Sequence, residues 1–363
     1  MTSMFQAADR LTGTPDDEAV FFESNFERVR APRDALVRAR CTDVLRASAP
    51  RLVLLAAPPG FGKTTLLAQW REVDDRAFAC VSLDSGDNDP VTFWSYIVHA
   101  IGQAAPECGA AALSALSEPR GDVVDAVVPA LLHDLEAIDE NLVLVLDDYQ
   151  EITNRSCHDL LNFFLERTPG NVTVALSTRS DPPIPMGRLR ALEELLELRA
   201  VDLSFTEAES ATFLNEILHL GLATESLGVL HERTEGWPVG VHLAAMSLSQ
   251  ADDRAGFVAH FGGASRHIVD YLTEVVLNTL DEEQHEFLLE TSVLDTMCGP
   301  LCDAAVGRQG SAEVLVELER ANLFLIPLDD RREWYRYHEL FADVLQYRLL
   351  QTDPELVRTV HRR

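Results

Sequence analysis

Five short apolar runs lie in the first 201 residues, and stretches with helical spacing separate them. The runs cover residues 51–57, 77–83, 142–148, 171–178 and 195–201. Several are continuously apolar, as in strands that are covered on both faces of a sheet. Between two of them, residues 90–104 carry apolar side chains at helix spacing. Alternating strands and helices predict an α/β domain with a parallel sheet.

The pattern changes after about residue 204, where strand signals fade and helical ones follow. Residues 204–218 predict a helix that Ser204 or Thr206 can cap, and Asp281 can cap another. Residues 322–340 combine an apolar run, an acidic turn and an aromatic run, which is typical of a β-hairpin. Helices followed by one hairpin favour a small winged-helix domain.

Composition and charge indicate a globular protein and argue against membrane and nucleic-acid partners. The chain has 363 residues, of which 47% are hydrophobic, so we expect a globular protein of two or three domains. No run approaches the roughly 20 apolar residues that span a membrane, and the N-terminus lacks a signal segment. We therefore expect a cytosolic protein without a membrane partner. A net charge of −29 repels polyanions, which argues against nucleic-acid binding by this segment alone.

The six cysteines are scattered and form no CxxC pair, so buried reduced thiols are expected. Cys298 and Cys302 could share a helix face. Two thiols without a second pair make a poor metal site.

Residues 57–64, APPGFGKT, lie between an apolar run and a helical stretch, which is the context of a phosphate-binding P-loop. Ala57 stands where the pattern GxxxxGK[ST] has its first glycine, and a negative φ there would make its methyl group tolerable. Backbone N–H groups and the helix N-terminus present positive dipoles to phosphates. The expected nucleotide contacts are Pro59, Gly60, Gly62, Lys63, Thr64 and Thr65. The alternative is a Gly-Lys-Thr turn that joins a strand to a helix by chance.

Specific roles follow for the side chains at the strand ends. Lys63 would place its ammonium at the β- and γ-phosphates, and Thr64 its hydroxyl on Mg²⁺. Asp147 would hold Mg²⁺ directly or through water, and Asp148 would orient or polarise an attacking water. Arg179 would reach the γ-phosphate and sense its presence. Asp147, Asp148 and Arg179 are the catalytic candidates, because the carboxyl ends of parallel strands lie at the same edge of a sheet. The alternatives are a helix cap or turn for the aspartates and a surface arginine in an Asp-Pro turn.

Together these motifs resemble the ATPase module of the STAND class of signalling NTPases, and in detail the N-terminal part of MalT-like, large ATP-binding LuxR-family transcriptional regulators. Matching stretches include APPGFGKTTLLAQW, LVLVLDDYQEI, RTEGWPVGVHLAAMSL and NLFLIPLDDRREWYRYHELFADVL. The resemblance implies an α/β P-loop NTPase domain, an α-helical lid and a winged-helix domain that clasp one nucleotide. It also implies that ADP holds a closed resting state, that ATP permits self-assembly, and that slow hydrolysis restores the ADP form.

The resemblance adds three site residues. It puts the family's sensor arginine on Arg179, its GxP lid motif on Gly236–Pro238 with Pro238 near the adenine ring, and a phosphate-touching histidine on His338. From the residues alone, GWP is a turn in which glycine ends one helix and proline opens the next. His338 is equally well explained as a histidine satisfied within its own domain.

The expected segments are a mobile leader (1–28), a P-loop NTPase domain (29–203), a helical lid (204–262), a winged-helix domain (263–345) and the start of a helical arm (346–363). In the family an arm, an inducer-binding helical-repeat sensor and a DNA-binding helix-turn-helix follow. The resemblance therefore implies that this chain is cut from something longer, and that a small-molecule inducer and DNA contact only those downstream parts.

The predicted function is an ATP/ADP-binding regulatory switch module of a signal-responsive transcriptional regulator, with ATP or ADP and Mg²⁺ as cofactors and self-association in the ATP state. One alternative is a stand-alone ATPase or small-molecule kinase. It would need an acceptor pocket near the γ-phosphate, for which no second motif is present. Another is a defence or scaffold protein of the same NTPase class, which would differ only after residue 363.

Overall fold

The computed structural model describes residues 29–116, 126–251, 253–352 and 354–355. The predicted leader, residues 1–28, lies outside the described residues, as does most of the predicted arm beyond α18.

Five parallel strands form one sheet in the order β2–β3–β4–β1–β5. They are β1 (Leu52–Ala56), β2 (Ala77–Ser82), β3 (Leu142–Asp147), β4 (Val172–Thr178) and β5 (Leu195–Arg199). Each strand lies within one of the five apolar runs, so the predicted parallel α/β sheet is confirmed. Because β4 separates β1 from β3, the P-loop and the aspartate pair flank the end of β4.

Two different sets of helices bury the two faces of the sheet. On one face, Leu52 and Leu54 join the core of α4 (Pro90–Ala104), α6 (Val128–Ala137) and α7 (Arg155–Arg167). On the other, Val53 and Leu55 join that of α2 (Ala39–Ala47) and α3 (Lys63–Val73). Shorter elements of this domain are η1 (Ser85–Asn88), α5 (Ala110–Leu116), η3 (Tyr149–Glu151) and α8 (Met186–Ala191).

A helical segment follows the sheet, as predicted for the lid. Its elements are α9 (Ala200–Leu203), α10 (Glu207–Ala211), the π-helical η4 (Thr212–Ile217), α11 (Thr224–Thr234), α12 (Pro238–Gln250) and α13 (Arg254–His260). Thr206, not Ser204, caps α10, because its hydroxyl accepts from the backbone N–H of Glu209. Gly236 has a φ of +69° and Pro238 is the first residue of α12, so the predicted GWP turn is present.

The last part combines helices with one antiparallel hairpin, the arrangement of a winged helix. Its elements are α14 (Arg266–Val275), η5 (Leu277–Thr279), α15 (Glu282–Thr291), α16 (Gly299–Val306), α17 (Ser311–Arg320), β6 (Leu325–Pro327), β7 (Tyr335–Tyr337) and α18 (Glu339–Thr352). Asp281 caps α15, as predicted, by accepting from the Gln284 N–H. The domain boundary predicted at residue 345 falls inside α18.

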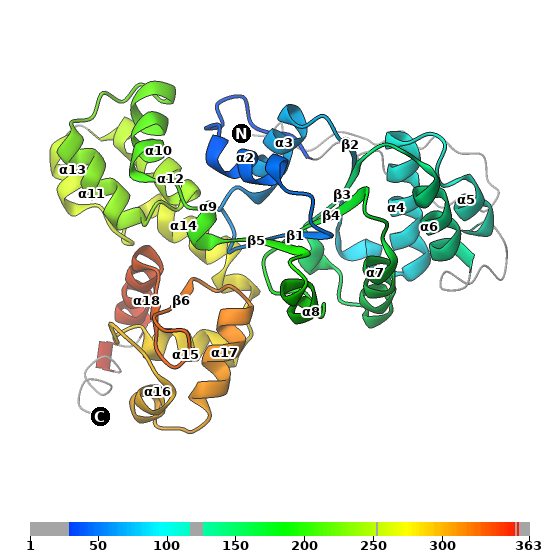
Figure 1. Ribbon diagram of the computed structural model, residues 1–363. Coiled ribbons are helices and arrows are strands. Elements are labelled where there is room, and N and C mark those ends of the chain that lie inside the picture. Colours follow the sequence, from blue (N-terminus) through cyan, green and yellow to red (C-terminus); the bar gives the residue numbers. More distant parts are fainter. Residues whose placement is uncertain (1–28, 117–125, 252, 353, 356–363) are drawn as a thin grey trace, which may run out of the picture.

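The lid and the winged-helix part lie on the side of the sheet away from α4, α6 and α7 (Figure 1). Their buried apolar side chains belong to the same core as α2 and α3. One continuous core thus joins all three parts on the face of the sheet that α2 and α3 cover.

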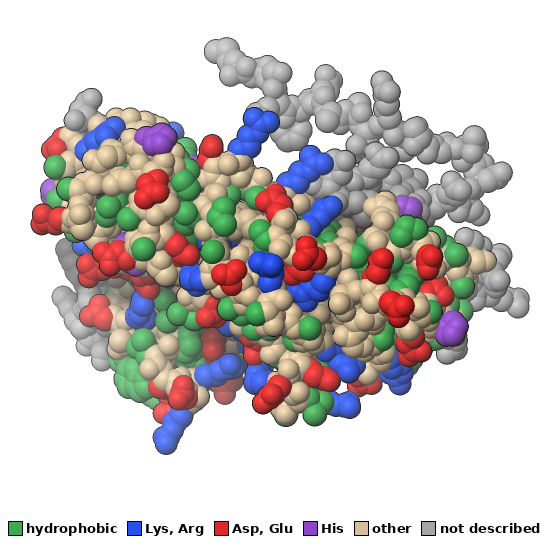
Figure 2. Space-filling model, turned by 45° about the horizontal axis from the view of Figure 1, so that its top comes forward, with side chains coloured by type: hydrophobic (Ala, Val, Ile, Leu, Met, Phe, Trp, Pro, Cys, Tyr) green, Lys and Arg blue, Asp and Glu red, His purple; other side chains and the backbone are tan. Residues whose placement is uncertain are grey.

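Three expectations from composition can be compared with the described residues. The cysteines are free thiols, five of them buried and Cys298 half-buried. Within the described ranges, no group of three His, Cys, Asp or Glu side chains could hold a metal ion, and no helix is long and apolar enough to cross a membrane. Figure 2 shows acidic and basic side chains interspersed over the face that it draws.

Candidate nucleotide-binding site

The P-loop follows β1 directly and begins α3. Gly60 and Gly62 have φ angles of +83° and +69°, a region that favours glycine. Ala57 is fully buried and keeps a negative φ, so its methyl group fits where the motif has a glycine. The expectation that this departure is tolerable is met.

Lys63, the only lysine in the sequence, is buried beneath the loop. Its Nζ donates to the carbonyl oxygens of Ala57 at 2.7 Å and Pro58 at 3.2 Å. Burial, and secondarily the charge of Arg179, lowers the pKa of Lys63 to about 8. An anionic phosphate would be a stronger partner for this ammonium than two neutral carbonyls.

Thr64 and Asp147 meet although 83 residues separate them. The Thr64 hydroxyl donates to Oδ2 of Asp147 at 2.7 Å, and burial raises the pKa of that carboxyl. A hydroxyl and a carboxylate are oxygen ligands of the kind that Mg²⁺ prefers. A divalent cation would also favour the charged form that burial disfavours. These two residues therefore fit the Mg²⁺ of a bound nucleotide.

Gln150 connects Asp148 to Arg179, the other two residues at the strand ends. Its Nε2 donates to Oδ1 of Asp148 at 2.8 Å, and its Oε1 accepts from the backbone N–H of Arg179 at 2.9 Å. Asp148 has a left-handed backbone with φ of 56°. Gln150 thus fixes the ends of β3 and β4 relative to each other. Gln150 was not among the predicted site residues, although its position two residues after the aspartate pair was a usable signal.

A cleft of about 590 Å³, here called the P-loop cleft, contains most of the predicted site. Its lining includes Pro59, Gly60, Gly62, Lys63, Thr64, Thr65, Asp148, Arg179 and Pro238. Apolar and aromatic side chains of the lid, among them Phe213, Leu218 and Val239, line it further, and Tyr271 of α14 does so too. Asp147 lies behind Thr64. The volume is in the range of small-molecule sites.

The GWP turn docks the lid on the P-loop. The indole Nε1 of Trp237 donates to the Pro59 carbonyl at 3.1 Å, and the Val239 N–H donates to that of Gly60 at 3.2 Å. A Cβ added to Gly60 would lie 2.7 Å from the Trp237 Nε1. Glycine is therefore required here for close approach as well as for its φ angle.

His338 does not line the P-loop cleft. Its Nε2 donates to the Thr234 carbonyl at 3.0 Å, and its ring packs edge-on against Trp237 and Phe324, with centroids 5.9 and 5.7 Å apart. Trp237 contacts both His338 and the loop, so the histidine is connected to the loop through the indole. Its contact with a phosphate stays a prediction.

Arg38, at the start of α2, supports the P-loop from beneath and was not predicted. The guanidinium is buried and donates to the carbonyls of Phe61 at 3.1 Å, Leu203 at 3.2 Å, and Gly62. Desolvation lowers its pKa to about 10. Binding these carbonyls from behind leaves the loop's N–H groups available to phosphates.

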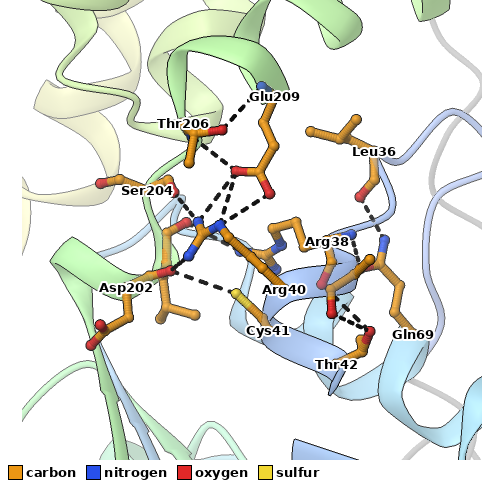
Figure 3. A network of polar contacts seen from close by, with 12 residues as sticks. Leu36, Arg38, Arg40, Cys41, Thr42, Gln69, Asp202, Ser204, Thr206 and Glu209 are labelled. Carbon is orange, nitrogen blue, oxygen red and sulfur yellow. Dashed lines mark hydrogen bonds and ion pairs between the residues drawn. The ribbon is translucent and has the colours of Figure 1, made fainter. Parts of the chain in front are cut away.

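Arg40, two residues further on, ties α2 to the start of the lid (Figure 3). Its guanidinium forms an ion pair with Glu209 at 3.1 Å and donates to the carbonyls of Asp202 at 2.6 Å and Ser204. We call Arg38 and Arg40 with these partners the α2 clasp. A single basic pair in a polar stretch is normally a surface feature, so no sequence motif indicated it.

Known protein families match two separate segments of the chain, and known proteins match nearly all of its length. An AAA domain matches residues 45–179, and a MalT winged-helix domain matches residues 272–357. The chain is 35% identical to serine/threonine-protein kinase PknK of Mycobacterium tuberculosis over 98% of its length and 33% of the kinase. It is 31% identical to the HTH-type transcriptional regulator MalT of Vibrio cholerae over 93% of its length and 38% of that protein.

Among solved structures, the Walker-type ATPase PABY2304 of Pyrococcus abyssi has the same fold. The TM-score is 0.61 at 15% identity, covering 87% of this chain and 98% of that one. The chain spans about a third of the length of the curated relatives it matches.

Proposed function

We propose that this chain, a MalT-like P-loop NTPase module, acts as an ATP/ADP-dependent switch in a signal-responsive transcriptional regulator. The AAA domain and winged-helix matches and the parallel sheet support nucleotide binding and the regulator family. Self-assembly in the ATP state, slow hydrolysis, a cytosolic location, and an inducer and DNA bound through segments outside this chain belong to the proposal.

One observation carries the switch hypothesis: residues of all three parts line the P-loop cleft. Lys63 comes from the NTPase domain, Pro238 from the lid and Tyr271 from α14. A nucleotide in the cleft would touch each part. A ligand shifts a conformational equilibrium only by its different affinity for the two states, so a site shared by three parts is suited to a switch.

The proposed roles follow from where the side chains lie. Lys63 would turn from the loop carbonyls to the β- and γ-phosphates, and Thr64 with Asp147 would hold Mg²⁺. Mg²⁺ would neutralise phosphate charge when bound. Asp148, oriented by Gln150, would position the attacking water. Apolar lid residues and Pro238 would accept the adenine ring.

Arg179 is where ATP and ADP would differ most. A γ-phosphate would attract its guanidinium and with it the segment that follows β4. The N–H of Asp181, two residues on, donates to the Arg320 carbonyl at the end of α17 at 2.9 Å. A shift of this segment would therefore alter a contact with the winged-helix part. This supports coupling between the nucleotide and the domain arrangement.

The relatives carry two different names, a kinase and a transcriptional regulator, over the same segment. This favours a regulatory module that serves more than one output over a chemical centre with its own substrate. A stand-alone ATPase or small-molecule kinase stays the alternative, and a steady, fast turnover independent of protein concentration would support it.

The test starts with the nucleotide itself. The purified chain is denatured, the released nucleotide is identified by chromatography, and the molar mass of the native protein is then measured by light scattering with ADP or ATP. We expect about one ADP per chain and a rise in mass with ATP. Absence of nucleotide binding contradicts the proposed nucleotide site. Equal molar mass with ADP and with ATP contradicts self-assembly in the ATP state.

A further inference from the structure

A second cavity, of about 720 Å³, shares the P-loop as a wall with the P-loop cleft. Pro58 and Phe61 of the loop line it, together with β5, α9, and the hairpin of β6 and β7. We call it the hairpin cavity. It is larger than the P-loop cleft, and of the predicted nucleotide contacts only His338 lines it.

The hairpin cavity lies between the NTPase domain and the winged-helix part. Two contacts at its wall cross from one to the other. One is the hydrogen bond from the Asp181 N–H to the Arg320 carbonyl at 2.9 Å, and the other is the packing of Phe61 on Phe324, with ring centroids 6.2 Å apart. A molecule in the cavity would touch both domains at once.

Left-handed backbone is concentrated around this cavity. Glu235, Asn322, Phe324 and Arg332 have φ angles between +49° and +58°, and all four line it. Non-glycine residues with a strained backbone in this region cluster at ligand clamps and switch regions. Phe324 is the least expected of them, because a bulky aromatic side chain is rare at positive φ.

Two polar atoms of lining residues are buried without a hydrogen-bond partner in the described chain, Nδ1 of His338 and Nδ2 of Asn322. Nε2 of His338 carries the proton that it donates to Thr234, so Nδ1 of the neutral ring is an acceptor, and only the Asn322 Nδ2 is a donor suited to an anion. His338 is 4% exposed. Buried polar groups without partners are rare, and a bound ligand or water is one usual explanation.

The cavity is also locally basic in an acidic protein. The lining contains five arginines, Arg190, Arg199, Arg320, Arg332 and Arg336, and four acids, Asp181, Glu197, Glu235 and Glu319. In the whole chain, 30 basic residues face 59 acidic ones. Within the described ranges, each of these arginines except Arg320 forms an ion pair with a lining acid. Arg320 is therefore the cation left to pair with a ligand.

Apolar side chains complete the lining. Phe61 and Phe324 are buried, and Ile326 is half-buried. Val201 of α9 lines the cavity and is 81% exposed, so a ligand there would cover apolar surface that now faces water. The ligand should then combine an acidic group with an apolar body.

We propose that the hairpin cavity binds a small organic anion, a carboxylate or a phosphate ester on an apolar body, and that the bound molecule holds the winged-helix part on the NTPase domain. The anion pairs with Arg320, and the Asn322 amide donates to it. The binding is independent of the proposed switch function. Its effect on nucleotide exchange rests on that function.

The first experiment measures binding to the chain saturated with ADP, which occupies the P-loop cleft. The probes are 2-naphthoate and 2-naphthyl phosphate, with neutral 2-naphthalenemethanol as the uncharged control, and calorimetry and saturation-transfer NMR detect them. We expect at least one anion to bind about tenfold or more tightly than the neutral probe. The stronger anion identifies carboxylate or phosphate. Equal binding of all three probes, or no binding of either anion, overturns the proposal.

Substitutions at two exposed positions test whether the anion binds in the hairpin cavity. Val201→Trp fills the opening and Arg320→Glu removes the free cation, and each should weaken anion binding about tenfold or more. The matched controls are Val44→Trp, 42% exposed on α2, and Arg155→Glu, whose side chain is 93% exposed on α7. The controls should bind like the parent chain. Unchanged binding in both cavity variants overturns the assignment.

The last readout is the release of a fluorescent ADP analogue. If the anion holds the two domains together, release slows about twofold or more in the parent chain and not in Val201→Trp. Anion binding without this difference overturns the holding role. If the analogue does not bind at all, the nucleotide proposal fails, while the anion titration, repeated without ADP, still decides whether the cavity is a site.

Discussion

Two buried cations hold the P-loop in different ways. Lys63 and Arg38 are 8% and 2% exposed, and both donate to backbone carbonyls of the loop. The partners of Lys63 lie five and six residues away, whereas Arg38 also binds Leu203, 165 residues further along the chain. A lysine is a point charge on a flexible stem, and an arginine is a rigid fork. Lys63 is thus suited to exchange its carbonyls for a ligand, while Arg38 maintains the shape of the loop.

The largest expected effect is on ADP binding, through Lys63. Lys63→Ala should weaken ADP binding at least about 100-fold, or about 2.7 kcal/mol, because the loop loses its only flexible cation. The free energy of unfolding should fall less than on loss of Arg38, since two nearby loop carbonyls lose their donor and no contact to a distant segment is lost. Calorimetric titration and urea unfolding measure the two quantities. Retention of ADP by this variant would contradict the assignment of the site.

Arg38→Met should lower the free energy of unfolding more than Lys63→Ala does. Three buried carbonyls lose their donor, and we expect the free energy of unfolding to fall by about 3 kcal/mol. ADP binding should weaken as well, because the loop is no longer held. The control is Arg46→Met in the last turn of the same helix, which is exposed. If Arg38→Met were as stable as this control, Arg38 would not shape the loop.

The affinity for ADP should depend on pH through Lys63. The pKa of Lys63 is lowered to about 8, and a bound phosphate favours the charged form. Below about pH 8 the ammonium is charged with or without ligand, so affinity should be constant. Above it, binding requires proton uptake, and the ADP dissociation constant should rise by up to about tenfold per pH unit. With only one lysine, ¹³C-lysine labelling gives one side-chain resonance. A midpoint near 10.5 without ligand would refute this.

The smallest effect is expected at the outer end of the α2 clasp. The Arg40 side chain is 38% exposed, so water can replace it at the carbonyls of Asp202 and Ser204. Arg40→Ala should cost less than about 1 kcal/mol, with a similarly small coupling to Glu209→Ala in a double-mutant cycle. Arg46→Ala is the control on the same helix. A cost near that of Arg38→Met would mean that the clasp acts as one unit.

The strands and the P-loop could be predicted because their signals are local. A buried parallel strand needs a run of about five apolar residues, and a P-loop needs its glycines, lysine and hydroxyl in order. Asp281 and Pro238 begin helices for equally local reasons. The cap of α10 was less certain, because Ser204 and Thr206 both offered a hydroxyl and only Thr206 lies three residues before Glu209.

Other parts of the site depend on contacts over long sequence distances. No local signal shows that Trp237 donates to Pro59 or that Phe324 packs on Phe61. The same holds for the position of His338, which lines the hairpin cavity and not the P-loop cleft.

The sequence by itself determined the chemistry available at the loop: one lysine, two strand-end aspartates and an arginine, in the order that a P-loop NTPase requires. Only the tertiary structure decided which backbone groups those side chains meet, and that a buried arginine holds the loop from behind. The reason is physical. Residue type and spacing set local conformation and charge, whereas burial, pKa and cavity shape come from segments that only the packed core brings together.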